Sequence, residues 1–152
     1  NDLMYQAMIE AKENSLVPST PIGILFEKDG RILLKAANGS DYHTKHGCER
    51  IKLGLPSGVG YEKCPGCSTE NHAEANAIKK GKVHRIDLSG SVVYMFGHFW
   101  ACEPCWDKMT KAGVNDVYLM KDAIKYFLRD DPGNKCGNYK YFEKRRNKLL
   151  NK

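Results

Sequence analysis

Two C-x-x-C pairs constrain the fold of this chain more than any other feature of its sequence. They are Cys64 with Cys67 and Cys102 with Cys105, and histidines lie close to them. The total of six cysteines is also compatible with a disulfide framework, but such frameworks belong to small secreted chains. Paired thiols with nearby histidines are typical of zinc sites in a reducing compartment. We therefore expect bound zinc and a cytoplasmic location.

The length and composition indicate one globular domain. Its 152 residues match the common domain size of about 100–150 residues, so we expect a single domain over residues 1–152. The sequence is 41% hydrophobic and 28% charged, which argues against a disordered or fibrous chain. No apolar run approaches the ~20 residues of a membrane-spanning helix, so we expect no membrane partner. The net charge of +6 favours anionic partners without choosing between metabolites and nucleic acid.

The order of the predicted elements indicates a layered α/β fold. Apolar periodicity predicts helices at residues 3–11, 72–80, 102–112 and 122–128. Strands are predicted at residues 22–27, 31–37, 91–96 and 114–120. Helices that alternate with strands imply a sheet with helices on both faces. A basic tail at about residues 139–152 is expected to be helical and to have a solvated charged face.

A Cys/His-rich insertion at about residues 41–71 shows little periodicity. A structureless segment of this length is unusual in a compact domain, so it requires either an internal staple or a function. Three thiols and one imidazole would close a tetrahedral structural zinc site, with Pro-Gly forming the tight turn between the two cysteines of the knuckle. The expected ligands are His46, Cys48, Cys64 and Cys67. His46 is preferred because it lies two residues from Cys48, with His43 as the alternative. The competing interpretation is that Cys64 and Cys67 are free or paired thiols and that the histidines are solvated.

Two short strings carry the chemistry of a second metal site. His72 and Glu74 lie two positions apart at a predicted helix start, so one can hold a metal while the other faces what the metal binds. Cys102 and Cys105 share one face of another helix start, where the amide dipoles favour thiolates. Three ligands leave the fourth position of zinc to a water, which becomes a nucleophile whose proton Glu74 can take. Taken singly, each string could be a capping histidine or a buried thiol pair; together they match the zinc deaminase pattern.

The sequence resembles the cytidine deaminase superfamily, and within it the deoxycytidylate (dCMP) deaminase branch. The string from His72 to Ile78 is similar to H-A-E-x-N-A-I, and Asn38-Gly39 is similar to the N-G of a G-Y-N-G loop. The similarity covers about residues 3–128. It implies a three-layer α-β-α domain with a central mixed sheet of about five strands and a zinc site at helix N-termini. It also implies a homo-oligomer.

The resemblance implies a role for each matching residue. His72, Cys102 and Cys105 would hold the catalytic zinc, and Glu74 would shuttle protons. Asn38 would hydrogen-bond the sugar, the backbone of Ala73 would meet the pyrimidine carbonyl, and the carbonyl of Trp100 would accept from the leaving amino group. Two departures, Ala101 in place of a usual proline and Trp100 in place of a small Ser or Thr, bear on substrate identity more than on reaction type.

Three functions follow from these observations. The leading hypothesis is zinc-dependent hydrolysis of a cytosine nucleotide, dCMP to dUMP and ammonia. The second is deamination of cytosine or adenine in RNA or single-stranded DNA, which the basic aromatic tail and Phe99-Trp100 motivate because bases stack on aromatic rings. The third is a non-catalytic zinc-binding module, and the presence of Glu74 argues against it.

Overall fold

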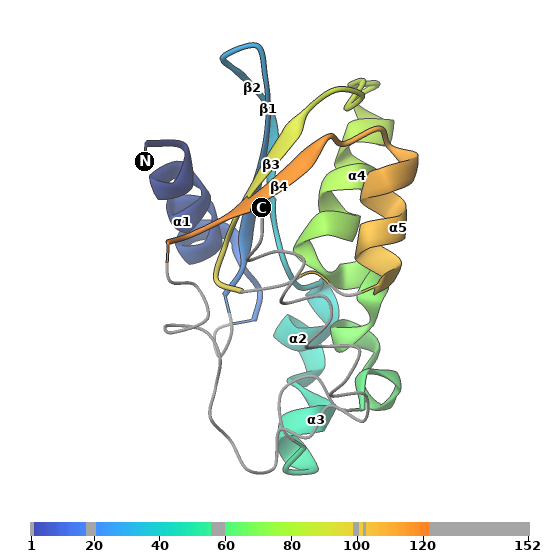
Figure 1. Ribbon diagram of the computed structural model, residues 1–152. Coiled ribbons are helices and arrows are strands. Elements are labelled where there is room, and N and C mark those ends of the chain that lie inside the picture. The colour runs from blue at the N-terminus through green and yellow to red at the C-terminus, as the bar shows by residue number, and fades with distance from the viewer. Residues whose placement is uncertain (1, 18–20, 56–59, 99–100, 102, 122–152) are drawn as a thin grey trace.

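A four-stranded mixed sheet forms the centre of the molecule (Figure 1). The computed structural model describes residues 2–17, 21–55, 60–98, 101 and 103–121. The strands are β1 (Gly23–Lys28), β2 (Arg31–Ala37), β3 (Val92–Phe96) and β4 (Asp116–Leu119). Their order in the sheet is β2-β1-β3-β4, with β1 antiparallel to both of its neighbours and β3 parallel to β4. The mixed sheet is confirmed, with four strands among the described residues where about five were expected.

The β1–β2 hairpin forms where the sequence predicts it. Asp29 and Gly30 both have positive φ, at 53° and 80°, which a two-residue turn of the twisted hairpin type requires. The backbone N–H of Gly30 donates to Glu27 Oε1 at 2.6 Å. The hairpin lies at the top of the sheet in Figure 1. β2 and β3 both end at the other end of the sheet.

Helices cover both faces of the sheet, which confirms the three-layer architecture (Figure 1). α1 (Asp2–Asn14) covers one face, and α4 (Ala73–Val83) and α5 (Glu103–Lys111) cover the other. α1 can approach β1 closely because residue 23 is glycine: a Cβ there would lie 2.1 Å from the carbonyl oxygen of Ala7. The expected helix at 122–128 and the tail at 139–152 lie outside the described residues.

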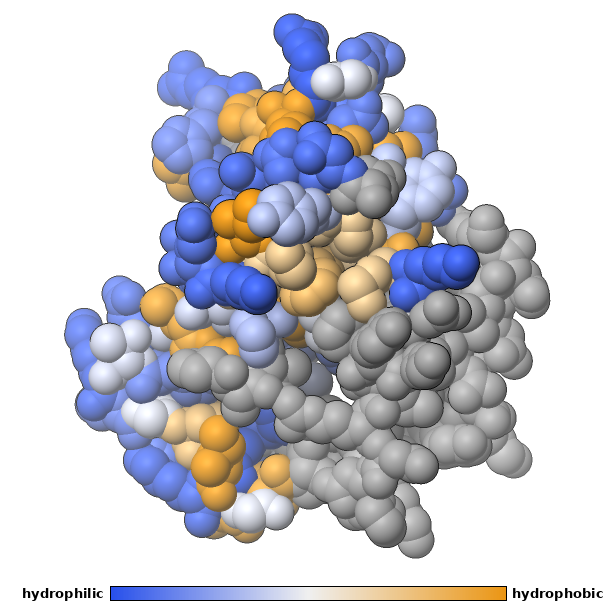
Figure 2. Space-filling view, turned by 90° about the vertical axis from the view of Figure 1, so that its left-hand side faces the viewer, coloured by the Kyte–Doolittle hydropathy of each residue, from blue (hydrophilic) through white to orange (hydrophobic). Residues whose placement is uncertain are grey.

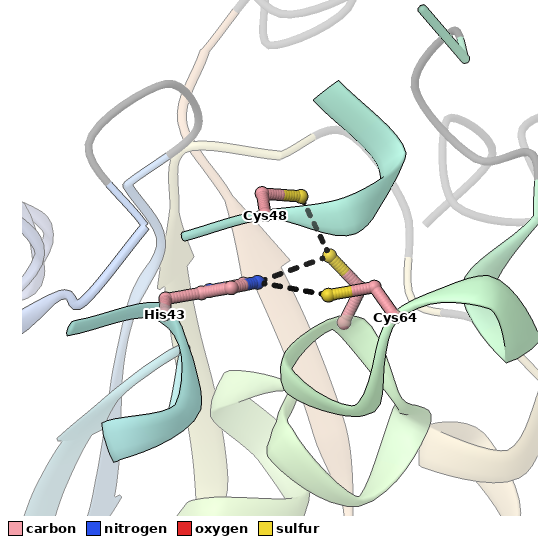
Figure 3. A group of neighbouring side chains, drawn as sticks. His43, Cys48 and Cys64 are labelled. Atoms are coloured by element: carbon pink, nitrogen blue, oxygen red, sulfur yellow. Dashed lines mark hydrogen bonds between the residues drawn. The ribbon is translucent and has the colours of Figure 1, made fainter. Parts of the chain in front are cut away.

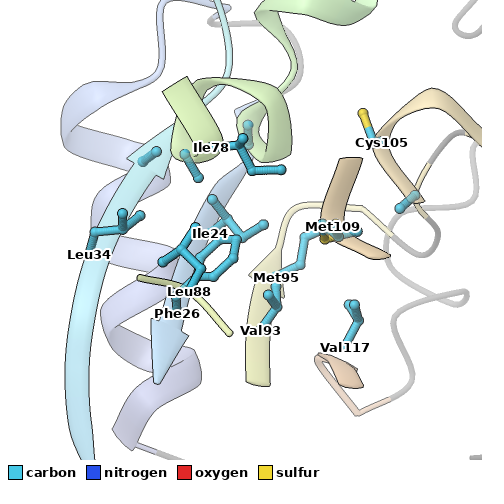
Figure 4. Close-up of a cluster of buried hydrophobic side chains, with 14 residues drawn as sticks. Ile24, Phe26, Leu34, Ile78, Leu88, Val93, Met95, Cys105, Met109 and Val117 are labelled. Atoms are coloured by element: carbon cyan, nitrogen blue, oxygen red, sulfur yellow. The ribbon is translucent and has the colours of Figure 1, made fainter. Parts of the chain in front are cut away.

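The main hydrophobic core lies between the sheet and the α4–α5 layer (Figure 4). Strand alternation sends Ile24 and Phe26 of β1 into this core and Leu25 to the α1 side, and all three are fully buried. Met109 of α5 packs into the same core. Cys105 belongs to this cluster as well, so the core fixes the position of a predicted metal ligand.

The surface is polar with scattered apolar side chains. Figure 2 faces the side of the molecule that carries α1 and shows hydrophilic side chains over much of the described surface, with apolar areas between them. The large apolar side chains that remain exposed are Tyr5, Leu16, Ile32, Ile51, Leu53, Val83 and Tyr118. Within the described part of the chain, no helix combines the length and the apolar character that a membrane crossing needs.

The insertion consists of short elements rather than one unstructured loop. It contains α2 (Asp41–His46), α3 (Glu49–Lys52) and three single 3₁₀ turns: η1 (Tyr61–Lys63), η2 (Pro65–Cys67) and η3 (Thr69–Asn71). Ser40 begins the first of these helices, since its Oγ accepts a hydrogen bond from the N–H of Tyr42. The short elements lie below the sheet in Figure 1, at the end where α4 begins.

Candidate active site and metal sites

Three predicted active-site residues come together at the N-termini of α4 and α5. His72 is the N-cap of α4, Glu74 lies in the first turn of that helix, and Cys105 lies in the first turn of α5. Their ligand atoms lie within 4.8 Å of one another. His72 Nδ1 is 3.6 Å from Cys105 Sγ. In a tetrahedral zinc site, with Zn–N of ~2.0–2.1 Å and Zn–S of ~2.3 Å, these two atoms would be about 3.5–3.6 Å apart, so the spacing fits zinc.

Burial and helix dipoles suit this group to hold a cation and to move a proton. Glu74 is only 5% exposed, Cys105 is fully buried, and His72 is partly exposed. Two helix N-termini face the group, and their positive ends favour the thiolate form of Cys105. Pro104 is the second residue of α5, where its missing N–H leaves no helical hydrogen bond unmade.

The remaining predicted residues of this site divide into two sets. Ala73 is fully buried at the first turn of α4, next to the metal-binding group, and Ala101 is 2% exposed. The predicted third ligand, Cys102, and the predicted substrate contact Trp100 both lie outside the described residues. Their roles therefore stay predictions.

Asn38 is held firmly at the same end of the sheet. Its Oδ1 accepts hydrogen bonds from Ser15 Oγ at 2.6 Å and from the N–H of Ile22 at 3.0 Å. The side chain is buried, with 9% of its surface exposed. Because Oδ1 is engaged within the protein, the orientation of the Asn38 amide is fixed.

Asn76 connects this loop to α4, a role that its position in the sequence does not predict. Its Nδ2 donates to the carbonyl oxygens of Ala37 at 2.9 Å, Gly39 at 3.0 Å and Asn71 at 3.3 Å. The signal in the sequence was a lone amide within a helix face of alanines, where a buried polar group needs partners. Asn76 thereby fixes the Asn38-Gly39 loop against the N-terminus of α4.

A second group of ligands lies in the insertion (Figure 3). His43 Nε2 is 3.4 Å from both Cys64 Sγ and Cys67 Sγ, and Cys48 Sγ is 3.5 Å from Cys67 Sγ. All four ligand atoms lie within 4.8 Å of one another. An S–S bond would need ~2.05 Å, so Cys48 and Cys67 do not form a disulfide. Sulfur–sulfur separations of about 3.8 Å and sulfur–nitrogen separations of about 3.6 Å are expected around tetrahedral zinc, so this set also fits the ion.

The histidine in this group is His43, and the preference for His46 is wrong. α2 ends at His46, and Gly47, with φ of 73°, redirects the chain before Cys48, so closeness in sequence does not become closeness in space. The ring of His46 instead lies against Tyr42, with centroids 4.8 Å apart, and His46 is exposed. His43 can reach the sulfurs because Gly66 leaves its ring room.

The thiols of this group differ in acidity. Burial disfavours the Cys64 thiolate, but hydrogen bonds from the backbone of Glu49 and from His43 bring its pKa down to about 6. Burial raises the pKa of Cys67 to about 12, although a hydrogen bond from Arg50 opposes the rise. The thiolate form of Cys64 is therefore favoured, whereas that of Cys67 is disfavoured. A bound cation removes that penalty, because its charge stabilises every thiolate around it.

Comparison with known proteins agrees with the fold and the site. A three-layer α/β domain that brings His, Glu and Cys together at two helix N-termini is the arrangement of zinc-dependent hydrolytic deaminases. Residues 1–121 match the family described as "Cytidine and deoxycytidylate deaminase zinc-binding region". The chain belongs to this family and is a zinc-dependent hydrolytic deaminase.

Several solved structures share its fold. The dCMP deaminase from cyanophage S-TIM5 in apo form has a TM-score of 0.53 and 24% identity, over 84% of this chain and 87% of that chain. The same phage enzyme in complex with dCMP and dUMP has a TM-score of 0.51 and 22% identity, over 82% and 86%. A diaminohydroxyphosphoribosylaminopyrimidine deaminase/5-amino-6-(5-phosphoribosylamino)uracil reductase from Thermotoga maritima has a TM-score of 0.50 and 20% identity, over 95% and 34%. No curated protein matches the sequence.

Proposed function

We propose that this deaminase acts on a free cytosine nucleotide and converts dCMP to dUMP and ammonia. The observation that carries the reaction type is the 3.6 Å spacing of His72 Nδ1 and Cys105 Sγ, with the Glu74 carboxylate in the same group. The buried Asn38 supports a nucleotide substrate, because a fixed amide donor suits recognition of a sugar hydroxyl. The fold shared with a protein solved in complex with dCMP and dUMP supports the same choice.

The proposed mechanism assigns a task to each residue of the group. His72, Cys105 and, by prediction, Cys102 would hold the zinc, which when bound would supply an activated water. Glu74 would take a proton and return it to the leaving amino group. With only 5% of its surface exposed, Glu74 is shielded from bulk solvent, which reduces proton exchange with solvent.

A panel of substrates tests the nucleotide proposal. We expect kcat/KM for dCMP to exceed that for deoxycytidine by much more than tenfold, because each charge-assisted phosphate contact contributes about 1.5–3 kcal/mol and about 1.36 kcal/mol is a factor of ten. Asn38→Ala should lower kcat/KM for dCMP and leave the zinc content unchanged. Turnover of a single-stranded oligonucleotide in preference to dCMP would instead support the nucleic-acid alternative.

Glu74→Gln separates catalysis from metal binding. The amide keeps the size of the side chain but cannot take a proton, so ammonia release should fall by at least 10²-fold with zinc retained. If the Glu74→Gln protein keeps parental turnover, the proposed mechanism is wrong.

We also propose that His43, Cys48, Cys64 and Cys67 hold a structural zinc. Four protein ligands leave no position for water, which is the pattern of structural rather than catalytic sites. Elemental analysis should then find two zinc ions per chain. The family resemblance further leads us to propose a homo-oligomer, which sedimentation of the intact protein would test.

A further inference from the structure

Tyr61 links the insertion to the active site. Its ring lies edge-to-face against the ring of His72, with centroids 5.0 Å apart and an interplanar angle of 79°. The Nδ1 atom of His72 faces Cys105. A histidine that binds a metal needs a fixed ring plane, because rotation of the ring moves the ligating nitrogen off the metal axis. Tyr61 is a neighbour that can restrain this rotation.

Arg50 of α3 connects Tyr61 to the second group of ligands. Its guanidinium lies over the Tyr61 ring, with Cζ 4.7 Å from the centroid. The same guanidinium hydrogen-bonds the sulfur of Cys67. A guanidinium between an aromatic face and a sulfur atom has contacts on both sides. The side chains therefore form a continuous line from Cys67 through Arg50 and Tyr61 to His72.

The backbone between Cys67 and His72 gives a second connection. η2 ends at Cys67, η3 (Thr69–Asn71) follows it, and the N–H of His72 donates to the carbonyl oxygen of Thr69 at 3.3 Å. Asn71 Nδ2 donates to the carbonyl oxygen of Pro65 at 2.9 Å. These hydrogen bonds thus fix the backbone position of His72, and the Tyr61 ring restricts the orientation of the His72 imidazole.

We propose that Tyr61 is a positioning residue for His72, and that Arg50 holds Tyr61 in place against the Cys67 side of the insertion. The inference rests on the proposed zinc at His72. In this proposal the insertion is a folded unit that also holds the His72 ring in the orientation needed to bind the catalytic metal. Loss of the Tyr61 ring should weaken metal binding at His72 even though Tyr61 is not itself a ligand. Partners of metal-bound histidines typically change affinity about 10–100-fold when they are removed.

The test uses the full chain loaded with Co²⁺ and, separately, with Zn²⁺. The His72→Ala protein gives the spectrum and chelator competition of the insertion metal alone, and its difference from the parent defines the catalytic metal. Tyr61→Leu removes the aromatic ring, and Tyr61→Phe keeps it. Arg50→Gln removes the guanidinium that lies over the ring. Matched controls are Tyr118→Leu, a tyrosine of β4 that packs on Tyr94, and Arg31→Gln, an exposed arginine.

We expect Tyr61→Leu to lower the affinity of the catalytic metal about 10–100-fold and to shift its Co²⁺ d–d band, with Tyr61→Phe restoring both. Arg50→Gln should shift both properties in the same direction by a smaller amount, and it remains informative if Tyr61→Leu does not fold. Both controls should match the parent. A catalytic metal unchanged in Tyr61→Leu and Arg50→Gln overturns the positioning role. If His72→Ala instead retains every metal ion of the parent, the proposed catalytic zinc itself fails.

Discussion

Gly66 has no room for a side chain between the two cysteines of its turn. A Cβ at this position would lie 2.7 Å from Cδ2 and from Nε2 of His43, a separation that real Cβ atoms do not adopt. We expect Gly66→Ala to displace the imidazole and to reduce zinc from two ions per chain to one, as measured by elemental analysis. The control is Gly81→Ala in α4, where the nearest atom is a flexible leucine carbon at 3.3 Å. That variant should keep both ions; Gly66→Ala with both ions would contradict the assignment of His43.

The two histidines of α2 give a matched pair for the same site. His43→Ala removes a ligand, and the binding energy of a structural zinc is part of the folding energy. We therefore expect a lower Tm and the loss of one zinc. His46→Ala changes an exposed side chain and should leave both quantities at the parental values. The reverse result, with His46→Ala losing zinc, would restore the choice made from sequence spacing.

These residues show how far spacing alone can locate a site. Spacing in the sequence predicts that the three cysteines of the insertion share one site, and the structure does bring them together. Ligand spacing does not favour His43 over His46. His43 reaches the cysteines because the chain turns at Gly47, which has a positive φ, and because Gly66 has no side chain, and the spacing of ligands reveals neither feature. The sequence does predict that His72, Glu74 and Cys105 lie close to helix N-termini, because signals of a helix start are local in the sequence.

Asn76 ties α4 to the loop that follows β2, and its loss should separate them. Asn76→Ala leaves the carbonyl oxygens of Ala37 and Gly39 without this donor in a part-buried position. We expect the free energy of unfolding in urea to fall by about 1–3 kcal/mol, and KM for dCMP to rise as Asn38 loses its support. The control is Asn115→Ala, whose Nδ2 makes one exposed bond to Gly90 at 3.3 Å. It should change stability by less than about 0.5 kcal/mol. Equal stability of Asn76→Ala and the parent would show that the loop is held by other contacts.

Strands and long helices could be predicted from the sequence, whereas the short elements of the insertion could not. β1 to β4 lie within two residues of the predicted ranges, since short apolar runs bounded by turn signals indicate strands. α2 has six residues and α3 has four, so neither completes enough turns to show a helical period. Ser40 caps α2, and His43 of the same helix contacts the cluster of thiols, so α2 is stabilised by local capping and by tertiary contacts.

The molecule has two kinds of core, and they should respond differently to removal of metal. The sheet and its helices bury an extensive apolar cluster. α2 and α3 have no buried residues, and the buried residues that the structure describes within 41–71 are Cys64, Gly66 and Cys67. Hydrophobic burial therefore contributes little to the order of the insertion, and the structural zinc that we propose would stabilise it.

Chelation of the full chain should accordingly open the insertion first and leave the sheet intact. In hydrogen exchange, we expect amides of residues 41–55 and 60–71 to lose protection with excess chelator, while β1 and β3 remain protected because their side chains lie in the apolar core. The His43→Ala protein should show the same regional loss without chelator. We expect catalytic activity to fall before the insertion loses protection. The catalytic site has an open position and a partly exposed ligand, His72, whereas four protein ligands close the second site, so the chelator should remove the catalytic metal first. Unchanged protection of the insertion after complete removal of metal would mean that contacts other than the zinc cluster hold it folded.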